Sequence, residues 1–184
     1  MKKILFIVGS LRSESFNRQL AMQAEKLLAG RAELEYMQYR DVPFFNQDVE
    51  YPVPESVERL RAAVKAADGL WIFCPEYNYS YPGVLKNLLD WLSRPVDPRD
   101  RRSGSVLAGK KAAISGAAGK SAAAGARRNL EALLKAMSMV PVGGSGTGVA
   151  LDAEAFQSGR LTLSAETIAA LSAQADELLA SLDA

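Results

Sequence analysis

The sequence contains no histidine and a single cysteine, Cys74. Histidine is the usual general base, the partner of serine and cysteine nucleophiles, and the commonest metal ligand. Its absence excludes Ser-His-Asp and Cys-His mechanisms and argues against zinc and iron-sulfur sites. One cysteine forms no internal disulfide and suits a reducing compartment such as the cytosol. Chemistry based on carboxylates or on a bound organic cofactor remains open.

The sequence also has no excess of either charge, because 22 Lys and Arg offset 21 Asp and Glu to give a net charge of +1. This balance provides no strong positive field for nucleic acid, and no acidic excess for an electron carrier that docks on basic proteins. One segment is rich in arginine, but Asp97 and Asp100 dilute it, so we interpret it as a solvated loop. Its arginines are Arg94, Arg99, Arg101 and Arg102.

Long hydrophobic runs are absent as well. Two lysines precede the apolar residues 4–8, but this run is too short for an export signal, and no small-residue cleavage site follows it. No stretch is long enough to span a bilayer. We therefore expect a cytoplasmic protein that has no membrane or nucleic-acid partner.

Short apolar runs alternate with patterns of helical spacing along the chain. The strand-like runs are 4–8, 34–37, 70–74, 111–115 and 140–142. Helical spacing follows at 20–28, 57–64, 84–92, 130–137 and 168–182, with Ser164 as the expected N-cap of the last helix. Right-handed crossovers place such helices on both faces of a parallel sheet, so we predict one doubly wound α/β domain over 1–184. The roles of the long loops 41–54 and 95–109 are left open.

The loop after the first run, residues 9–17, combines hydroxyls, an amide and a guanidinium where a helix begins. Ligands of doubly wound folds bind beyond the carboxyl ends of the strands. Ser10, Ser15 and Asn17 can each hydrogen-bond phosphate oxygens, Arg12 adds a full charge, and a helix N-terminus adds about half a positive charge. A simple helix cap explains one or two of these residues but not the whole cluster, so we favour a phosphate site.

Other known phosphate-binding motifs do not match the sequence. Gly119-Lys120-Ser121 resembles the end of a Walker A loop, but Ile114 occupies the position of its first glycine. No G-x-G-x-x-G follows the first strand, so dinucleotide binding of the Rossmann type is not expected. The residues after Cys74 supply no phosphate cradle, and we interpret this cysteine as buried rather than as a phosphatase nucleophile.

The loop that follows the run 70–74 is rich in aromatic residues. It reads Pro75-Glu-Tyr-Asn-Tyr-Ser-Tyr-Pro-Gly83 and contains three tyrosines and an asparagine. Rings and backbone amides at the end of a strand can frame a flat aromatic ligand. The alternative for Tyr79 and Tyr81 is that they brace a subunit interface or cover the core. Both roles can coexist.

Taken together, these loops resemble those of the NAD(P)H-dependent FMN reductases, a family of flavodoxin-like fold that includes quinone, chromate and azo-dye reductases. The resemblance is carried by Gly9-Ser-Leu-Arg-x-x-Ser-x-Asn17 and Pro75-Glu-Tyr-Asn-Tyr-Ser-x-Pro-Gly-Val-Leu-Lys-Asn-Leu-Leu-Asp-Trp91. Ala124-Gly-Ala-Arg127 is similar to the third loop of the family, although Ala124 replaces a more usual glycine and the loop is longer. The implied fold is a flavodoxin-like, three-layer sandwich with a central parallel sheet of about five strands.

The resemblance implies that FMN binds with its phosphate on the first loop and its isoalloxazine edge along the second. The first-loop residues are Ser10, Arg12, Ser15, Phe16 and Asn17. The second-loop residues are Pro75, Glu76, Tyr77 and Asn78. Ser115 and Gly116 are expected to approach the ring or the ribityl chain. No metal site and no catalytic side chain are implied, because the flavin carries the chemistry.

The implied reaction is ping-pong electron transfer from NADPH or NADH, through flavin N5, to an acceptor. Quinones are the leading acceptors, and azo dyes, chromate and free flavin are related ones. The family forms dimers or tetramers, and Tyr79, Tyr81 and Trp91 are candidate interface residues. One alternative is a non-enzymatic FMN electron carrier of the flavodoxin type, against which the balanced charge argues. Another is a binding module without FMN.

Overall fold

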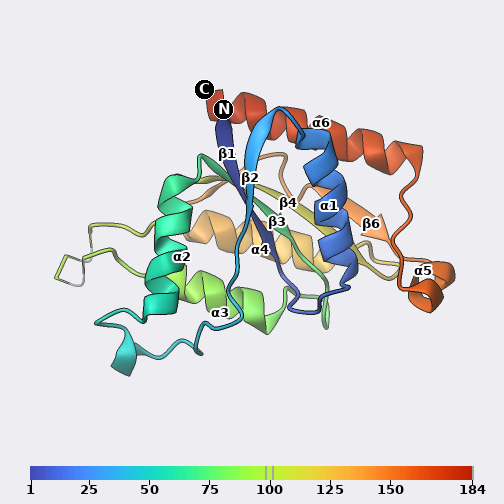
Figure 1. Cartoon of the computed structure of the whole chain (residues 1–184). Helices are drawn as coiled ribbons and strands as arrows, with labels where there is room; N and C mark the ends of the chain where they lie inside the picture. The colour runs from blue at the N-terminus through green and yellow to red at the C-terminus, as the bar shows by residue number, and fades with distance from the viewer. Residues whose placement is uncertain (98, 101, 184) are drawn as a thin grey trace.

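The sheet is built from parallel strand pairs in the order β2-β1-β3-β4-β5, with β6 also paired to β4 (Figure 1). The strands are β1 (Lys2–Val8), β2 (Ala32–Tyr36), β3 (Gly69–Phe73), β4 (Lys111–Ala118), β5 (Val140–Pro141) and β6 (Thr147–Ala150). The computed structural model describes residues 1–97, 99–100 and 102–183, so Arg101 of the arginine-rich segment lies outside the described residues.

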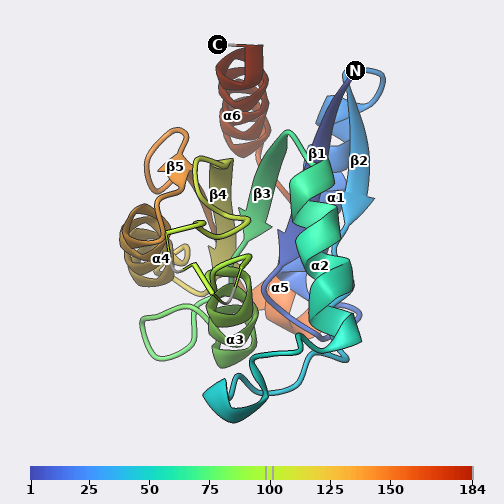
Figure 2. The ribbon, with the colours of Figure 1, turned by 90° about the vertical axis from the view of Figure 1, so that its left-hand side faces the viewer.

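Helices cover both faces of the sheet (Figures 1 and 2). They are α1 (Phe16–Leu28), the 3-10 helix η1 (Gln47–Val49), α2 (Glu55–Ala66), α3 (Gly83–Leu92), α4 (Ala124–Ala136), α5 (Ala153–Ser158) and α6 (Ala165–Asp183). Side chains alternate across β1, so Leu5 and Ile7 pack towards α2, α3 and α4, whereas Ile4, Phe6 and Val8 pack towards α1 and α6. The predicted doubly wound, flavodoxin-like architecture is confirmed.

The helix starts that the sequence indicates are largely correct. Ser15 is the N-cap of α1, since its side chain accepts a hydrogen bond from the Arg18 amide. Ser164 is confirmed as the cap of α6, because the Thr167 amide donates to its hydroxyl at 3.1 Å. Pro54 precedes α2, which begins at Glu55. Within the described ranges, no helix is both long and apolar enough to cross a membrane.

The edge of the sheet beside β4 is interrupted, and the prediction that 140–142 is the last strand is wrong. β5 pairs with Lys111 and Ala112, and β6 resumes the pairing from Ser115 to Ala118. Between them, the Gln174 side chain of α6 donates to the Ile114 carbonyl at 2.7 Å and so replaces a missing ladder bond. The start of β6 could not be predicted from the sequence, because it lies in the glycine-rich segment 143–148 and glycines give no strand pattern.

Candidate functional site

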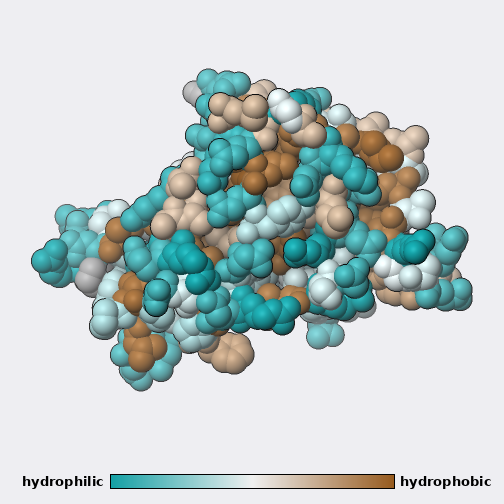
Figure 3. Space-filling model, viewed as in Figure 1, coloured by the Kyte–Doolittle hydropathy of each residue, from teal (hydrophilic) through white to brown (hydrophobic). Residues whose placement is uncertain are grey.

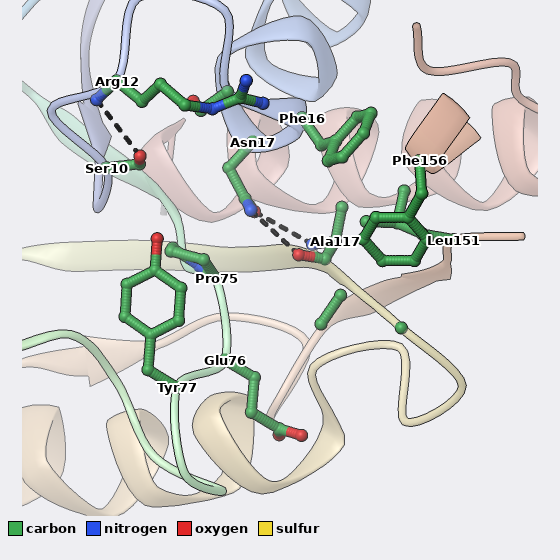
Figure 4. A pocket seen from close by; sticks show the side chains of 13 residues that line it. Ser10, Arg12, Phe16, Asn17, Pro75, Glu76, Tyr77, Ala117, Leu151 and Phe156 are labelled. Carbon is green, nitrogen blue, oxygen red and sulfur yellow. Dashed lines mark hydrogen bonds between the residues drawn. The ribbon is translucent and has the colours of Figure 1, made fainter. Parts of the chain in front are cut away.

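The first two loops singled out in the sequence meet at one edge of the sheet, where β1, β3 and β4 end. A cavity of about 230 Å³ lies there (Figure 4). Its lining combines hydroxyl, amide, cationic and aromatic side chains with residues 117–119 at the end of β4. The lining residues are Ser10, Arg12, Ser15, Phe16, Asn17, Pro75, Glu76, Tyr77, Ala117, Ala118, Gly119, Leu151 and Phe156.

The first loop passes very close to the second. The Gly9 amide donates to the Phe73 carbonyl at 2.8 Å, and a Cβ on Gly9 would lie 3.1 Å from Cδ of Pro75. Beyond this contact, the Arg12 amide donates to the Ser10 hydroxyl oxygen at 3.3 Å. Glycine at position 9 therefore lets both loops border the same cavity, with Ser10 and Arg12 beside the start of α1.

Asn17 lines the cavity, but its amide group already has partners. Its Nδ2 donates to the Ala117 carbonyl and its Oδ1 accepts from the Ala117 amide, both at 2.9 Å (Figure 4). The side chain is only 2% exposed. Asn17 therefore joins the first turn of α1 to the end of β4, and the sequence analysis, which assigned it to a phosphate, missed this positioning role.

Aromatic residues form one wall of the cavity. The rings of Phe16 and Phe156 meet edge to face with centroids 5.8 Å apart, and the Arg12 guanidinium lies 5.6 Å from the Phe16 centroid (Figure 4). Phe156 belongs to α5, which the sequence analysis did not identify. The only local signal for α5 is Asp152, whose side chain accepts from the Ala155 amide at 2.8 Å as an N-cap.

The second loop contributes Pro75, Glu76 and Tyr77 to the lining, but not Asn78. Asn78 and Tyr79 have φ values of 50° and 62°, and the Ser80 amide donates to the Tyr77 carbonyl at 3.1 Å. Positive φ at both central residues defines a tight turn of type I′. This turn carries Asn78 beyond the cavity and leaves the Tyr79 side chain 81% exposed.

Glu76 caps a helix as well as bordering the cavity. Its Oε2 accepts from the Ala126 amide at 2.8 Å, in the first turn of α4, where the N-cap residue Ala123 has no side-chain acceptor. A hydrogen bond from Ser121, then the amides of Ala126 and Gly125, hold the pKa of Glu76 below its ordinary value of 4.5. Glu76 is therefore a carboxylate that stabilises α4 from another loop.

Ser115 and Gly116 were expected at the flavin, but the structure does not bring them to the cavity. β4 continues to Ala118, so the sheet ends three residues later than the apolar pattern indicates. Ser115 is fully buried, accepts from the Trp71 indole at 3.0 Å and donates to Gln174 at 2.8 Å. The cavity is instead lined by the residues that follow Ser115 and Gly116, which are Ala117, Ala118 and Gly119.

The segment 124–127, which resembles a third flavin loop, is the first turn of α4 and does not line the cavity. Arg127 instead donates to the carbonyls of Ala122, Ser145 and Gly146. It thereby holds the glycine-rich segment between β5 and β6 against α4.

Cys74 is fully buried, as expected. Burial raises the pKa of its thiol to about 12, so the thiol is protonated at neutral pH and does not act as a nucleophile.

The residues of the cavity fit FMN in the chemistry of their donors. Arg12, the Ser10 hydroxyl and the start of α1 form a cationic, hydrogen-bonding end suited to a phosphate. Pro75, Tyr77 and Phe156 offer apolar and aromatic surfaces to a flat ring. The cavity lies at the carboxyl edge of the strands, where doubly wound sheets bind their ligands. Fold and cavity together define a flavodoxin-like domain with a site for a phosphate-bearing aromatic cofactor.

Residues 2–153 match the NADPH-dependent FMN reductase family, and the chain belongs to this family. It is similar to a 2-hydroxy-1,4-benzoquinone reductase of Burkholderia sp, with 42% identity over 62% of this chain and 59% of the relative. It is also similar to an NAD(P)H-dependent FMN reductase of Pseudomonas aeruginosa, with 39% identity over 76% of this chain and 73% of the relative. The match therefore spans between about three fifths and three quarters of these two relatives.

A solved structure shares both the fold and part of the sequence. It is the flavoenzyme FerB, an NAD(P)H:(acceptor) oxidoreductase from Paracoccus denitrificans, with a TM-score of 0.85 and 31% identity. The similarity covers 100% of this chain and 98% of that one.

The helix cap formed by Glu76 predicts a pH-dependent stability. Because its folded-state pKa is depressed, its contribution is present above the unfolded value near 4.5 and is lost as the pH falls through the lower folded value. We expect Glu76→Gln to lower the free energy of unfolding by about 1 kcal/mol at pH 7, the usual size of an N-cap contribution. The difference from wild type should shrink below pH 4.5, as urea unfolding of both proteins would measure.

The exposed carboxylate of Glu177, on α6, provides the control as Glu177→Gln. An equal effect of the two substitutions at pH 7, or a Glu76→Gln difference that persists unchanged at low pH, would contradict the capping role.

Proposed function

We propose that the protein is an FMN-dependent reductase that transfers electrons from NADPH or NADH to quinones or related small acceptors. The observation that carries this proposal is a cavity in which a cationic, hydrogen-bonding end adjoins aromatic walls at the carboxyl edge of the sheet. The names of the relatives support it, since one is a benzoquinone reductase and another is an FMN reductase.

In this proposal the protein binds and orients the reactants. FMN, when bound, supplies the redox chemistry by accepting a hydride and passing electrons on. Ser10, Arg12 and the amides at the start of α1 hold its phosphate, while Pro75 and Tyr77 border the ring. The Gly119 backbone contributes polar groups at the same end of the sheet. No side chain is assigned as an acid or base, because Cys74 is protonated and Glu76 caps α4.

Quinones are the acceptors that this site favours. The cavity has aromatic and apolar walls, which suit flat molecules, and the exposed Tyr77 leaves one side accessible to solvent. Azo dyes, chromate and free flavin are further proposed acceptors, since a site that selects by shape discriminates weakly between them. We place the protein in the cytoplasm, as suits its one buried cysteine.

Absorption spectroscopy tests the cofactor and the reaction together. We expect the purified protein to retain yellow FMN after desalting, to bleach with anaerobic NADPH or NADH, and to regain its colour when a quinone is added. Arg12→Ala and Ser15→Ala should weaken FMN retention at least tenfold, by removing a charged phosphate contact and the α1 cap. Arg128→Ala, an exposed arginine on α4, is the control.

Colourless protein would contradict the proposal. Bound colour that does not respond to either nicotinamide would instead identify an electron carrier.

Steady-state kinetics test the order of the reaction. Because the nicotinamide and the acceptor use the same cavity in turn, we expect ping-pong behaviour. Double-reciprocal plots of rate against NADPH at several quinone concentrations should give parallel lines. Intersecting lines would show that both substrates are bound at once and would count against a shared cavity.

We also propose that the protein is a homo-oligomer, either a dimer or a tetramer. Phe44 and Tyr79 are 87% and 81% exposed, and Val49 is 50% exposed in the loop that precedes α2. Figure 3 shows apolar residues among hydrophilic ones over this loop. Trp91, which was expected at an interface, is instead fully buried and donates to the Pro43 carbonyl at 2.8 Å, which fixes the loop on α3.

Light scattering after gel filtration would measure the mass in solution. We expect a dimer or tetramer, and we expect Phe44→Asp to shift the mass towards the monomer because it places a charge on an apolar contact. Met22→Asp, at a half-exposed position on α1, is the control. A wild-type monomer would overturn the proposal.

A further inference from the structure

A second cavity, of about 280 Å³, adjoins the cavity of the candidate site, which we call the flavin cavity. It opens between that loop, the first turn of α1 and the residues that follow β2. Ser10 and Arg12 line both cavities, so the first loop is a wall that they share. We call this second cavity the arginine pocket, after its residues Arg12, Arg18 and Arg40.

The arginine pocket has an uncompensated positive charge. Its lining includes the three arginines and one carboxylate, Glu14. Within residues 1–97, 99–100 and 102–183, none of the three guanidiniums forms an ion pair. Arg31, Arg59 and Arg94 do form ion pairs, with Asp176, Asp41 and Glu50. What distinguishes the arginine pocket is that three guanidiniums without such a pair among the described residues line the same cavity. Unpaired guanidiniums that line one hollow are the usual recognition elements for phosphate.

Contacts with the protein hold these guanidiniums in place. Arg40 donates to the Leu11 carbonyl, which ties the segment after β2 to the first loop. The Arg18 guanidinium lies 5.5 Å from the centroid of the Tyr36 ring. The hydroxyl of that tyrosine donates to Glu25 at 2.8 Å, so a carboxylate lies behind the ring. Because Arg12 is held over Phe16, all three side chains are partly ordered before a ligand arrives.

We propose that the arginine pocket binds the 2′-phosphate of NADPH, and that the protein therefore prefers NADPH to NADH. This inference rests on the proposed function. The nicotinamide must reach the flavin cavity, and the adenosine end of the same molecule then needs a site beyond it. The shared wall of Ser10 and Arg12 makes the arginine pocket an immediate neighbour.

The chemistry of the lining supports the 2′-phosphate in particular. This phosphate distinguishes NADPH from NADH, and guanidiniums that are not paired with carboxylates suit it. Here β2 ends at Tyr36, and the residues that follow it in the lining are Met37, Gln38, Tyr39 and Arg40. None of them is acidic, and the pocket is much larger than a single phosphate requires. Strongly hydrophilic residues occupy the surface between the lower ends of β2 and α1 (Figures 1 and 3).

Direct binding of 2′,5′-ADP to the FMN-loaded protein tests the assignment. Isothermal titration should show binding that weakens with added salt, and much weaker binding of 5′-AMP and of inorganic phosphate. Arg18→Gln and Arg40→Gln should each weaken 2′,5′-ADP binding about tenfold, the usual cost of one charged hydrogen bond. Arg18→Lys should restore part of the affinity, and Arg128→Gln, outside the pocket, should change nothing.

Kinetics with both nicotinamides give a second readout. Arg18→Gln should raise KM for NADPH about tenfold, while kcat, KM for NADH and FMN retention stay at wild-type values. Equal affinity for 2′,5′-ADP and inorganic phosphate, or unchanged affinity in both arginine variants, would overturn the nucleotide assignment. An active wild type with those results would leave the reductase proposal standing, whereas a wild type that oxidises neither nicotinamide would refute the reductase itself.

Discussion

The candidate site depends on the pair of hydrogen bonds between the Asn17 side chain and the Ala117 backbone, which joins parts of the chain 100 residues apart. Both bonds are buried, and an unsatisfied amide there would cost about 1–3 kcal/mol. The pair fixes the start of α1, which carries the first loop, against the end of β4. Ala118 and Gly119, which follow directly, are thereby held at a set distance from the first loop. A cofactor bound between them meets two walls that cannot move independently.

The irregular edge of the sheet serves the same site. A continuous strand from Val140 would run past the cavity, but the break after β5 lets β6 pair with the last residues of β4. β6 then delivers Leu151 and Phe156 to the cavity wall. The break leaves the Ile114 carbonyl without a strand partner, and Gln174 satisfies it. Together with Arg127, which holds the glycine-rich connection, Gln174 makes an interrupted edge compatible with a packed core.

The sequence was sufficient for the doubly wound, parallel architecture and for bringing two of the loops to one edge, because buried parallel strands are apolar runs and their carboxyl ends share that edge. It was insufficient where the signal is not periodic. Residues 115–118 are small and uniform, so nothing in the sequence marked the end of β4, and Ser115, which was expected to approach the flavin, does not line the cavity. A helix as short as α5 has no amphipathic pattern, so Phe156 was missed. The role of Asn17 depends on a hydrogen bond to Ala117, 100 residues away, and that of Asn78 on a positive φ. Neither feature can be seen in the local sequence pattern.

In the proposed function the flavin carries the chemistry and the protein contributes binding, so the charges around the cavity matter chiefly for recognition. Glu76, a carboxylate that lines the flavin cavity, accepts a hydrogen bond from the Ala126 amide at the start of α4, which offsets part of its charge. Three arginines that form no ion pair with the described residues, Arg12, Arg18 and Arg40, line the arginine pocket beside the first loop, and Arg12 also lines the flavin cavity. Binding energy from groups remote from the reacting atoms can position the reacting end of a substrate. In the proposed function the first loop therefore links phosphate recognition to the redox site. Two hydrogen bonds to backbone carbonyls hold this loop, one from the Gly9 amide to Phe73 and one from the Arg40 side chain to Leu11.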